Sequence, residues 1–236
     1  MTAASTHGLD LLIFAAHPDD AEIGMGGTIV KHVLAGRKVG IIDLTFAEMS
    51  SNGDVDTRQR EAEAASRELG LTVRENLGLP DRRLALVPEQ LDPMVSAIRR
   101  HRPRLVFAPY HVDRHPDHIA CSRMAEEAVF NAKLRRYMPH EPAWTVDQLM
   151  FYFINDVHAP GVIVDITDVQ ERKMAALRAY RSQFEPFGAQ ADWVETPLTR
   201  GYLDNVAARD KLFGQPQRMA FAEGFIAKGP VRFDLF

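Results

Sequence analysis

The apolar residues of this 236-residue chain fall into short continuous runs that alternate with segments of helical spacing. A continuous apolar run is typical of a strand buried on both faces, whereas apolar residues three and four apart predict an amphipathic helix. The runs predict strands at residues 11–16, 39–45, 71–77 and 104–108. The intervening and following segments predict helices at residues 22–35, 57–69, 89–100 and about 117–131.

This alternation predicts an α/β fold in which helices cover both faces of a mostly parallel, doubly wound sheet. Beyond it we expect strands at 149–154 and 162–166, a helix from about 168 to 184, and a helix at about 201–213. A capping box of Asp168 and Glu171 would begin the first of these helices. The segment 185–199 has no regular pattern, and the tail from Met219 is ambiguous. No repeat or linker divides the chain, so we expect a single domain over residues 1–236.

Composition narrows the class of protein. The formal net charge is −4, which gives no electrostatic reason to expect a nucleic acid or an anionic membrane as partner. The single cysteine, Cys121, fits a reducing compartment. No apolar run approaches the roughly 20 residues that span a bilayer, and the N-terminus does not resemble a signal peptide. We therefore expect a soluble, cytoplasmic protein without membrane or nucleic-acid partners.

Ionisable residues follow the first strand directly, in the sequence His17-Pro18-Asp19-Asp20. Such groups at the end of a buried strand are costly unless something uses them. A second, similar cluster follows the fourth strand and contains His115, Asp117 and His118. In a doubly wound sheet the first and fourth strands are neighbours, and their carboxyl ends flank the switch-point crevice. The two clusters should therefore face each other across one cleft.

The facing clusters predict a metal site. A catalytic zinc takes three protein ligands and leaves one position open, and His17, Asp20 and His118 supply a suitable set. Ferrous iron tolerates the same ligands. Asp19 would remain unligated and could accept a proton from water, whose pKa the metal lowers. His115 could stabilise an oxyanion and protonate a leaving amine.

Asp117 could hold His115 in one tautomer and keep it protonated.

Simpler interpretations exist for several of these features. A lone His-Pro-Asp-Asp is most often a capped turn before a helix. The isolated His111 and His158 are more typical of histidines in solvated loops. Cys121 is more typical of a cysteine packed in the buried core. The glycines in Gly24-Met25-Gly26-Gly27 lack dinucleotide-binding spacing and favour close helix packing.

Four stretches resemble the zinc-dependent N-acetylglucosaminyl deacetylases, and the resemblance covers nearly the whole chain. They are Ala16-His17-Pro18-Asp19-Asp20, Glu48-Met49-Ser50-Ser51-Asn52-Gly53, residues 110–118, and Thr196-Pro197-Leu198-Thr199-Arg200-Gly201-Tyr202. The first and third are typical of the family, and the others are most similar to its bacillithiol-biosynthesis branch, which acts on N-acetylglucosaminyl malate. The resemblance implies a Rossmann-like fold, one divalent metal, and the ligand and catalytic roles given above.

The resemblance also implies roles for residues that spacing alone does not single out. Arg58 would bind substrate, and a cation in the first turn of a helix is itself explained by a nearby anion. Tyr202 would be a mobile hydroxyl near the reacting carbonyl, and Arg114 a further substrate contact. The segment 183–194 is longer than the branch pattern. A homo-oligomer, such as the hexamer that occurs among similar proteins, is also expected.

Three hypotheses for the function follow. The first is hydrolysis of the acetyl amide of an N-acetylglucosamine conjugate, in particular N-acetylglucosaminyl malate. The second keeps this machinery but accepts N-acetyl sugars broadly, including chitooligosaccharides. The third is a non-catalytic, metal-dependent carbohydrate-binding protein, which the presence of both Asp19 and His115 disfavours because binding alone requires neither.

Overall fold

The computed structural model describes residues 8–185 and 193–231. Their core is one seven-stranded sheet with the order β3-β2-β1-β4-β5-β7-β6. The strands are β1 (Leu11–Ala15), β2 (Val39–Asp43), β3 (Val73–Asn76), β4 (Leu105–Pro109), β5 (Gln148–Tyr152), β6 (Val162–Asp165) and β7 (Ala222–Ala227). The pairs among β1 to β5 are parallel, and β7 runs antiparallel to both of its neighbours. The predicted single α/β domain with a mostly parallel sheet is confirmed.

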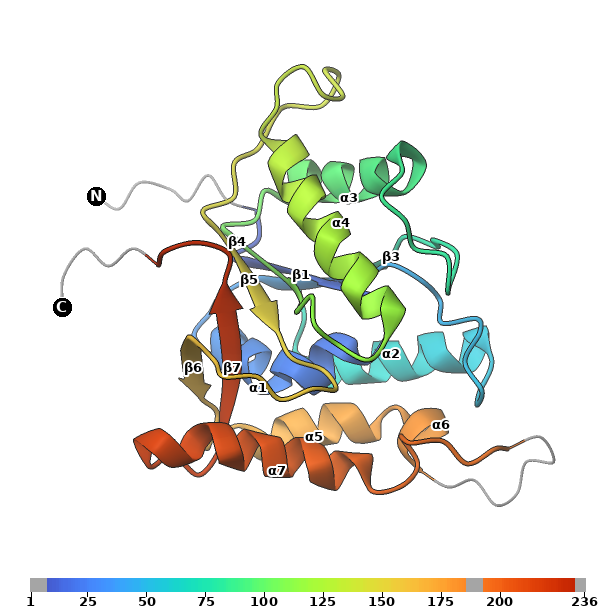
Figure 1. Cartoon of the computed structure of the whole chain (residues 1–236), viewed down its shortest axis with the longest axis vertical. Coiled ribbons are helices and arrows are strands. Elements are labelled where there is room, and N and C mark those ends of the chain that lie inside the picture. The colour runs from blue at the N-terminus through green and yellow to red at the C-terminus, as the bar shows by residue number, and fades with distance from the viewer. Residues whose placement is uncertain (1–7, 186–192, 232–236) are drawn as a thin grey trace.

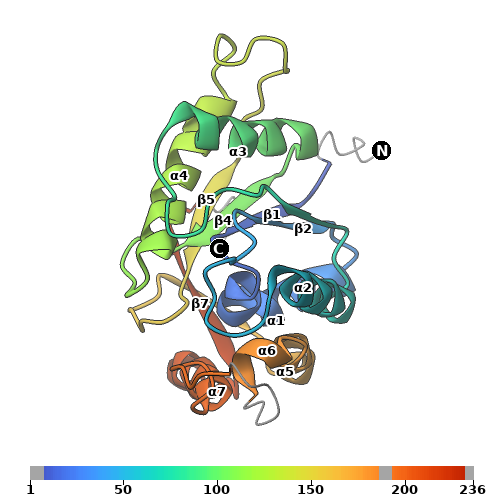
Figure 2. The ribbon, with the colours of Figure 1, turned by 90° about the vertical axis from the view of Figure 1, so that its right-hand side faces the viewer.

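Helices cover both faces of this sheet (Figure 1, Figure 2). The α-helices are α1 (Asp20–Leu34), α2 (Val55–Leu69), α3 (Pro88–His101), α4 (Pro116–Ala132), α5 (Gln170–Arg178), α6 (Arg181–Phe184) and α7 (Tyr202–Gly214). In Figure 2, α3 and α4 lie on one side of the sheet, and α1 and α2 on the other. Helices α5, α6 and α7 form a further layer beyond α1 and α2. No described helix is long and apolar enough to cross a membrane.

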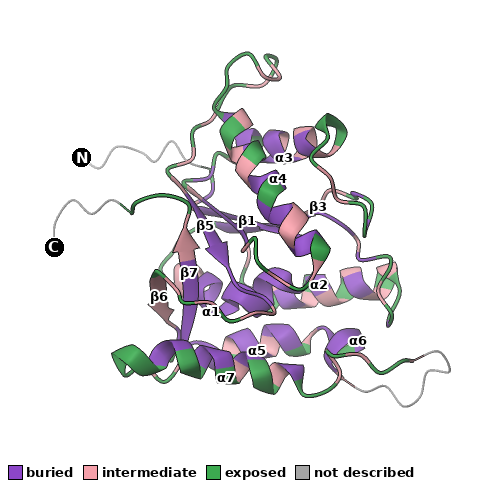
Figure 3. Cartoon of the chain, viewed as in Figure 1, coloured by how far each residue is buried: buried purple, intermediate pink, exposed green. Residues whose placement is uncertain are grey.

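The apolar run in β1 divides between two cores. Leu11 and Ile13 belong to the core beneath α1 and α2, whereas Leu12 and Phe14 belong to the core beneath α3 and α4. Since alternate side chains of a strand point to opposite faces, a strand covered on both sides must be apolar throughout. Figure 3 shows the resulting buried interior. The sequence pattern therefore reflects the central place of β1 in the sheet.

Two details of the second half differ from the sequence-based expectation. The predicted capping box is wrong, because α5 begins at Gln170 and its N-cap residue, Val169, makes no side-chain cap. The expected continuous helix is also interrupted, since Tyr180 leaves the helical conformation between α5 and α6. Tyr180 is fully buried and its hydroxyl donates to Glu22. The ambiguous tail contains β7, the antiparallel strand.

The predicted switch point is present. Strand β1 pairs with β2 on one side and with β4 on the other, so the chain winds outward in both directions from its first strand. The carboxyl ends of β1 and β4 therefore lie side by side, and each leads into one of the two histidine-containing segments.

Candidate metal centre and active site

The segment after β1 turns sharply before entering α1. Asp19 is the N-cap residue of α1 and has φ of 117°, a left-handed conformation that strains a non-glycine residue. The backbone amide of His17 donates to Asp20 Oδ2 at 2.9 Å, which fixes the turn. Backbone strain of this kind is often concentrated where a site needs a particular side-chain direction. Here the Asp20 carboxylate contacts His17 and His118, whereas the neighbouring Asp19 carboxylate contacts Arg58.

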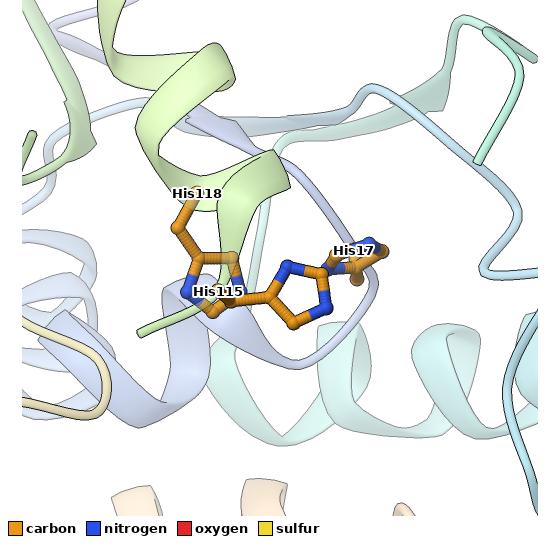
Figure 4. Close-up of side chains that lie close together, drawn as sticks. All are labelled: His17, His115 and His118. Carbon is orange, nitrogen blue, oxygen red and sulfur yellow. The ribbon is translucent and has the colours of Figure 1, made fainter. Parts of the chain in front are cut away.

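Three imidazoles converge beside these carboxylates. His17, His115 and His118 each offer a nitrogen atom within 4.8 Å of the other two. Figure 4 shows the rings together, with His118 on α4, His115 immediately before this helix, and His17 on the segment that follows β1. Asp20 joins the group, since Oδ2 lies 3.6 Å from His17 Nδ1 and Oδ1 lies 3.1 Å from His118 Nε2. The structure thus brings the three predicted ligands into one cluster.

Further carboxylates orient the two predicted histidine ligands. His17 Nε2 is 3.1 Å from Asp81 Oδ1, and His118 Nδ1 is 3.0 Å from Asp113 Oδ1. A carboxylate on one ring nitrogen fixes the imidazole and leaves the other nitrogen for a metal. His17 Nδ1 and His118 Nε2 are therefore the nitrogens available beside Asp20. These roles of Asp81 and Asp113 were not predicted from the sequence, although both residues lie in loops that follow strand ends.

The protonation of this cluster matches a cation-binding site. Burial would raise the pKa of Asp20, but His118 and His17 hold it well below its ordinary value. Burial opposes charge on His118, yet Asp20 and Asp113 raise the pKa of His118 to about 9. These histidines hold protons where negative charge gathers, and a bound cation would take the place of those protons. Two imidazoles and a carboxylate are a donor set that suits one divalent metal.

Asp19 lies next to this cluster with an unusual environment. Burial raises its pKa to about 7, although Arg58 acts in the opposite direction. Arg58 Nη1 is 3.4 Å from Asp19 Oδ2, and both side chains are buried. That carboxylate oxygen makes no hydrogen bond with any described residue. A carboxylate that has an oxygen without a hydrogen bond and a pKa near neutrality is suited to general-base chemistry.

The predicted role of the Asp117 carboxylate requires correction. Its oxygens accept hydrogen bonds from Arg82, and Oδ2 lies 3.4 Å from His17 Nε2. It is the backbone amide of Asp117 that donates to His115 Nδ1, at 3.2 Å. Nδ1 is thereby an acceptor, so a neutral His115 carries its proton on Nε2. Burial and the nearby His118 and His17 lower the pKa of His115 to about 4, opposite to the prediction of a protonated ring.

The cluster opens into a pocket of about 180 Å³. Its lining includes all but one of the predicted site residues, namely His17, Asp19, Asp20, Arg58, Arg114, His115, His118 and Tyr202. The exception is Asp117, which contacts His17 but does not line the pocket. Tyr202 is buried, and its hydroxyl donates to Asn155 Oδ1 at 3.0 Å. Arg114 is exposed on the pocket wall.

The glycines beside the centre allow close packing, as predicted. A Cβ atom on Gly24 would lie 2.2 Å from Tyr152 Cδ2, and one on Gly27 would lie 2.8 Å from Ile166 Cβ. Cys121 is fully buried, which agrees with its predicted packing role. The glycine contacts fix the start of α1 against β5 and the segment that follows β6.

A doubly wound sheet with a histidine–carboxylate centre at its switch point defines the class, an α/β enzyme with a candidate metal site. Residues 12–129 match the family model "PIG-L: GlcNAc-PI de-N-acetylase", and the chain belongs to this deacetylase family. The resemblance drawn from the four sequence stretches is confirmed at this level.

Individual relatives cover most of the chain. The diacetylchitobiose deacetylase of Thermococcus kodakarensis is 33% identical, over 74% of this chain and 70% of the relative. The probable N-acetyl-alpha-D-glucosaminyl L-malate deacetylase 2 of Bacillus subtilis is 31% identical, over 74% of this chain and 83% of the relative. The crystal structure of the conserved protein TT1542 from Thermus thermophilus superposes with a TM-score of 0.87 and 41% identity, covering 95% of this chain and 97% of that one.

Proposed function

We propose that this protein is a zinc-dependent deacetylase that hydrolyses the acetyl amide of an N-acetylglucosamine conjugate. The observation that carries this proposal is the position of Asp19 and His115 beside His17, Asp20 and His118. A binding protein would need a ligand set alone, whereas hydrolysis also needs a base and an acid or oxyanion donor. Family membership supports the same reaction class.

His17, Asp20 and His118 would hold the metal, with Asp81 and Asp113 orienting the two imidazoles. A divalent metal at this position supplies Lewis-acid polarisation of the acetyl carbonyl and lowers the pKa of water. Zinc fits this donor set well, although ferrous iron tolerates it too.

The protein groups divide the proton transfers between them. Asp19 takes a proton from the attacking water, since the residue lines the pocket and its Oδ2 makes no hydrogen bond with any described residue. His115 also lines the pocket and carries its proton on Nε2, from which it can donate to the developing oxyanion. The proton accepted by Asp19 then has to reach the departing amine, directly or through His115. Tyr202 lines the same pocket, but its hydroxyl is engaged by Asn155, so it must rotate to reach substrate.

The size of the pocket and the arginines at its mouth favour a conjugate with an acidic aglycone. A pocket of about 180 Å³ is smaller than the roughly 300–1,000 Å³ of typical ligand sites, so only the reacting part of a substrate is enclosed. The aglycone would lie at the mouth, where Arg82 and Arg114 contribute positive charge. Arg82 already contacts Asp117, which leaves Arg114 as the exposed arginine at the mouth for a substrate carboxylate, beside the buried Arg58 predicted from the sequence. N-acetylglucosaminyl malate has this chemistry.

A neutral N-acetyl sugar is the second candidate. It is favoured by the 33% identity with a diacetylchitobiose deacetylase, which is similar to the 31% identity with the malate-conjugate relative. Both substrates would place the same acetyl group at the centre and differ only at the pocket mouth.

A substrate panel on zinc-loaded protein tests these proposals. We expect acetate release from N-acetylglucosaminyl malate with a kcat/KM at least tenfold above that for diacetylchitobiose or N-acetylglucosamine. Arg114→Gln should remove most of this preference by raising KM for the malate conjugate alone. A preference for diacetylchitobiose would favour the second candidate, and no acetate release from any of the three would contradict the deacetylase proposal. Self-association, including a hexamer, stays a prediction for light scattering.

A further inference from the structure

Helix α1, which begins with the Asp19–Asp20 pair, is broken soon after its first turn. Met25 has φ of −151° and ψ of 22°, values outside the helical range, so α1 consists of two helical pieces joined at a kink. Each piece has an end at the kink, where backbone groups lose their regular partners and need others. The partners come from the C-terminal part of the chain, more than 180 residues away.

Glu223 of β7 accepts hydrogen bonds from backbone amides on the C-terminal side of the kink. Its two carboxylate oxygens accept from the backbone amides of Gly27 and Thr28, at 2.9 and 2.7 Å. In a regular helix the partner of the Gly27 amide would be the Ile23 carbonyl. Glu223 is buried and is held in place by the fully buried Lys173, whose Nζ lies 2.8 Å away.

Arg209 of α7 donates a hydrogen bond to a backbone carbonyl on the N-terminal side of the kink. Its Nη2 donates to the carbonyl oxygen of Ile23 at 2.6 Å. Its Nη1 donates to the carbonyl oxygen of Ile154, in the segment that follows β5. Arg209 is buried, so a single rigid guanidinium bridges the first turn of α1 and the segment after β5.

The Ile154 end of this bridge continues to the second half of the metal centre. Asn155, the next residue, donates through its backbone and side-chain amides to Asp113, at 3.1 and 2.9 Å. Asp113 in turn holds His118 Nδ1 at 3.0 Å. Asn155 also accepts from the Tyr202 hydroxyl. Through Nη1 the contacts from Arg209 lead to His118, a predicted ligand. Through Nη2 they lead to the first turn of α1, which follows directly on Asp19 and includes Asp20.

We propose that Arg209 is a positioning residue that sets the separation between Asp20 on α1 and His118 on α4. Arg209 does not itself line the pocket; its Nη1 and Nη2 donate to two main-chain carbonyls, and its Nε lies 4.0 Å from Asp210 Oδ1. A metal requires ligand atoms at defined distances, so a shift of one half of the site relative to the other weakens binding and misplaces Asp19. This proposal rests on the proposed assignment of His17, Asp20 and His118 as ligands.

The test replaces Arg209 by methionine, which keeps most of the side-chain length and removes every donor, and by lysine, which keeps the charge but cannot donate as a planar fork. The matched control is Arg99→Met. Arg99 is also buried, and its guanidinium also donates to main-chain carbonyls, but these lie at and after the end of α4, far along the chain from the histidines: Asn131, Ala132, Leu134, Met138 and Glu141.

Zinc affinity is measured for each variant by competition with a chromophoric chelator, at a temperature where thermal melts show the protein to be folded. For Arg209→Met we expect a 10- to 100-fold weaker zinc affinity, the range found when partners of metal ligands are removed. The zinc affinity of Arg209→Lys should be at least fivefold weaker than that of the wild type. Arg99→Met should lower the melting temperature but change zinc affinity less than twofold. With zinc held saturating, Arg209→Met should lower kcat more than it raises KM.

Wild-type zinc affinity in Arg209→Lys, or an equal loss of affinity in Arg99→Met, would overturn the positioning role. If Arg209→Met does not fold, the lysine variant decides the question. The zinc measurements do not depend on turnover, so an absence of acetate release in every sample would overturn the proposed function and leave the test of Arg209 intact. Conversely, full activity with unaltered zinc affinity in both Arg209 variants would overturn only the inference about Arg209.

Discussion

Arg58 Nη1 lies 3.4 Å from Asp19 Oδ2, and each side chain is buried. Arg58 belongs to the first turn of α2, where the helix dipole disfavours a cation unless an anion is near. The sequence led us to expect that this anion would be a substrate. The structure supplies Asp19 instead, while Arg58 also lines the pocket. Substrate binding by Arg58 stays a prediction, and its effect on Asp19 gives it a second way to influence the reaction.

The first prediction concerns Asp19 itself. Asp19→Asn keeps the size of the side chain and removes its ability to accept a proton. We expect kcat to fall by about 100- to 10,000-fold, the usual contribution of a general base, with little change in KM. The measurement is acetate release by protein whose zinc content has been determined by elemental analysis. Undiminished kcat in a fully loaded sample would show that another group is the base.

The second prediction separates the two roles of Arg58. Because Arg58 opposes the burial that raises the pKa of Asp19, removing its charge should raise that pKa further. The acidic limb of the pH profile of kcat/KM should therefore move to higher pH in Arg58→Gln and move less in Arg58→Lys. If Arg58 also binds a substrate carboxylate, KM should rise for N-acetylglucosaminyl malate but not for diacetylchitobiose. An unchanged acidic limb would contradict the electrostatic role.

The parts that the sequence predicted are those carried by local pattern. Continuous apolar runs located β1 and β4, and the switch-point rule then brought His17 and His118 together. The contact that orients His17 was out of reach, because Asp81 lies 64 residues from His17 and only the folded loops bring the two side chains together. Asp113 lies five residues before His118, so this second contact was local but was not predicted. Local sequence patterns did not predict the contacts that form only when distant segments pack together.

Two errors show how tertiary contacts can override a local sequence pattern. The Asp168 capping box was wrong because the side chain turns toward Lys31, 3.4 Å away, while α5 begins two residues later. Strand β7 was not recognised because its sequence contains Glu223 and Gly224, which are uncommon inside strands. Glu223 is buried there because it holds the kinked helix and Lys173, a reason that exists only in the folded chain.

The third prediction concerns removal of metal and its dependence on pH. Asp20 and Asp113 raise the pKa of His118 to about 9, so at pH 7 a cation must displace a proton from this ring. Zinc binding should release protons, and affinity should fall as pH is lowered from 9. Titration calorimetry in two buffers of different ionisation enthalpy measures the protons released. Equal apparent enthalpies in both buffers would contradict the coupling.

Chelation should have a matching effect on stability. A ligand that binds only the folded state stabilises it by mass action, so stripping zinc should lower the melting temperature and abolish acetate release. Adding zinc back should restore both. The control is Asp20→Asn, which weakens the site itself and should melt at the same temperature with and without chelator.

The last prediction concerns the packing that supports the start of α1. A Cβ on Gly24 would lie 2.2 Å from Tyr152 Cδ2, and the Tyr152 ring is buried with its hydroxyl donating to Phe14. The ring cannot move aside without losing that hydrogen bond, so Gly24→Ala should destabilise the protein by about 1–3 kcal/mol, as overpacking does. Gly229→Ala is the control, because a Cβ there meets no atom within 4 Å, and it should change stability by less than about 0.5 kcal/mol. Both values are measured by urea denaturation of the zinc-free protein, so that a change in metal binding does not contribute. Equal stability of the two variants would show that α1 can shift away from β5, and the fixed start of α1 inferred from these contacts would then be wrong.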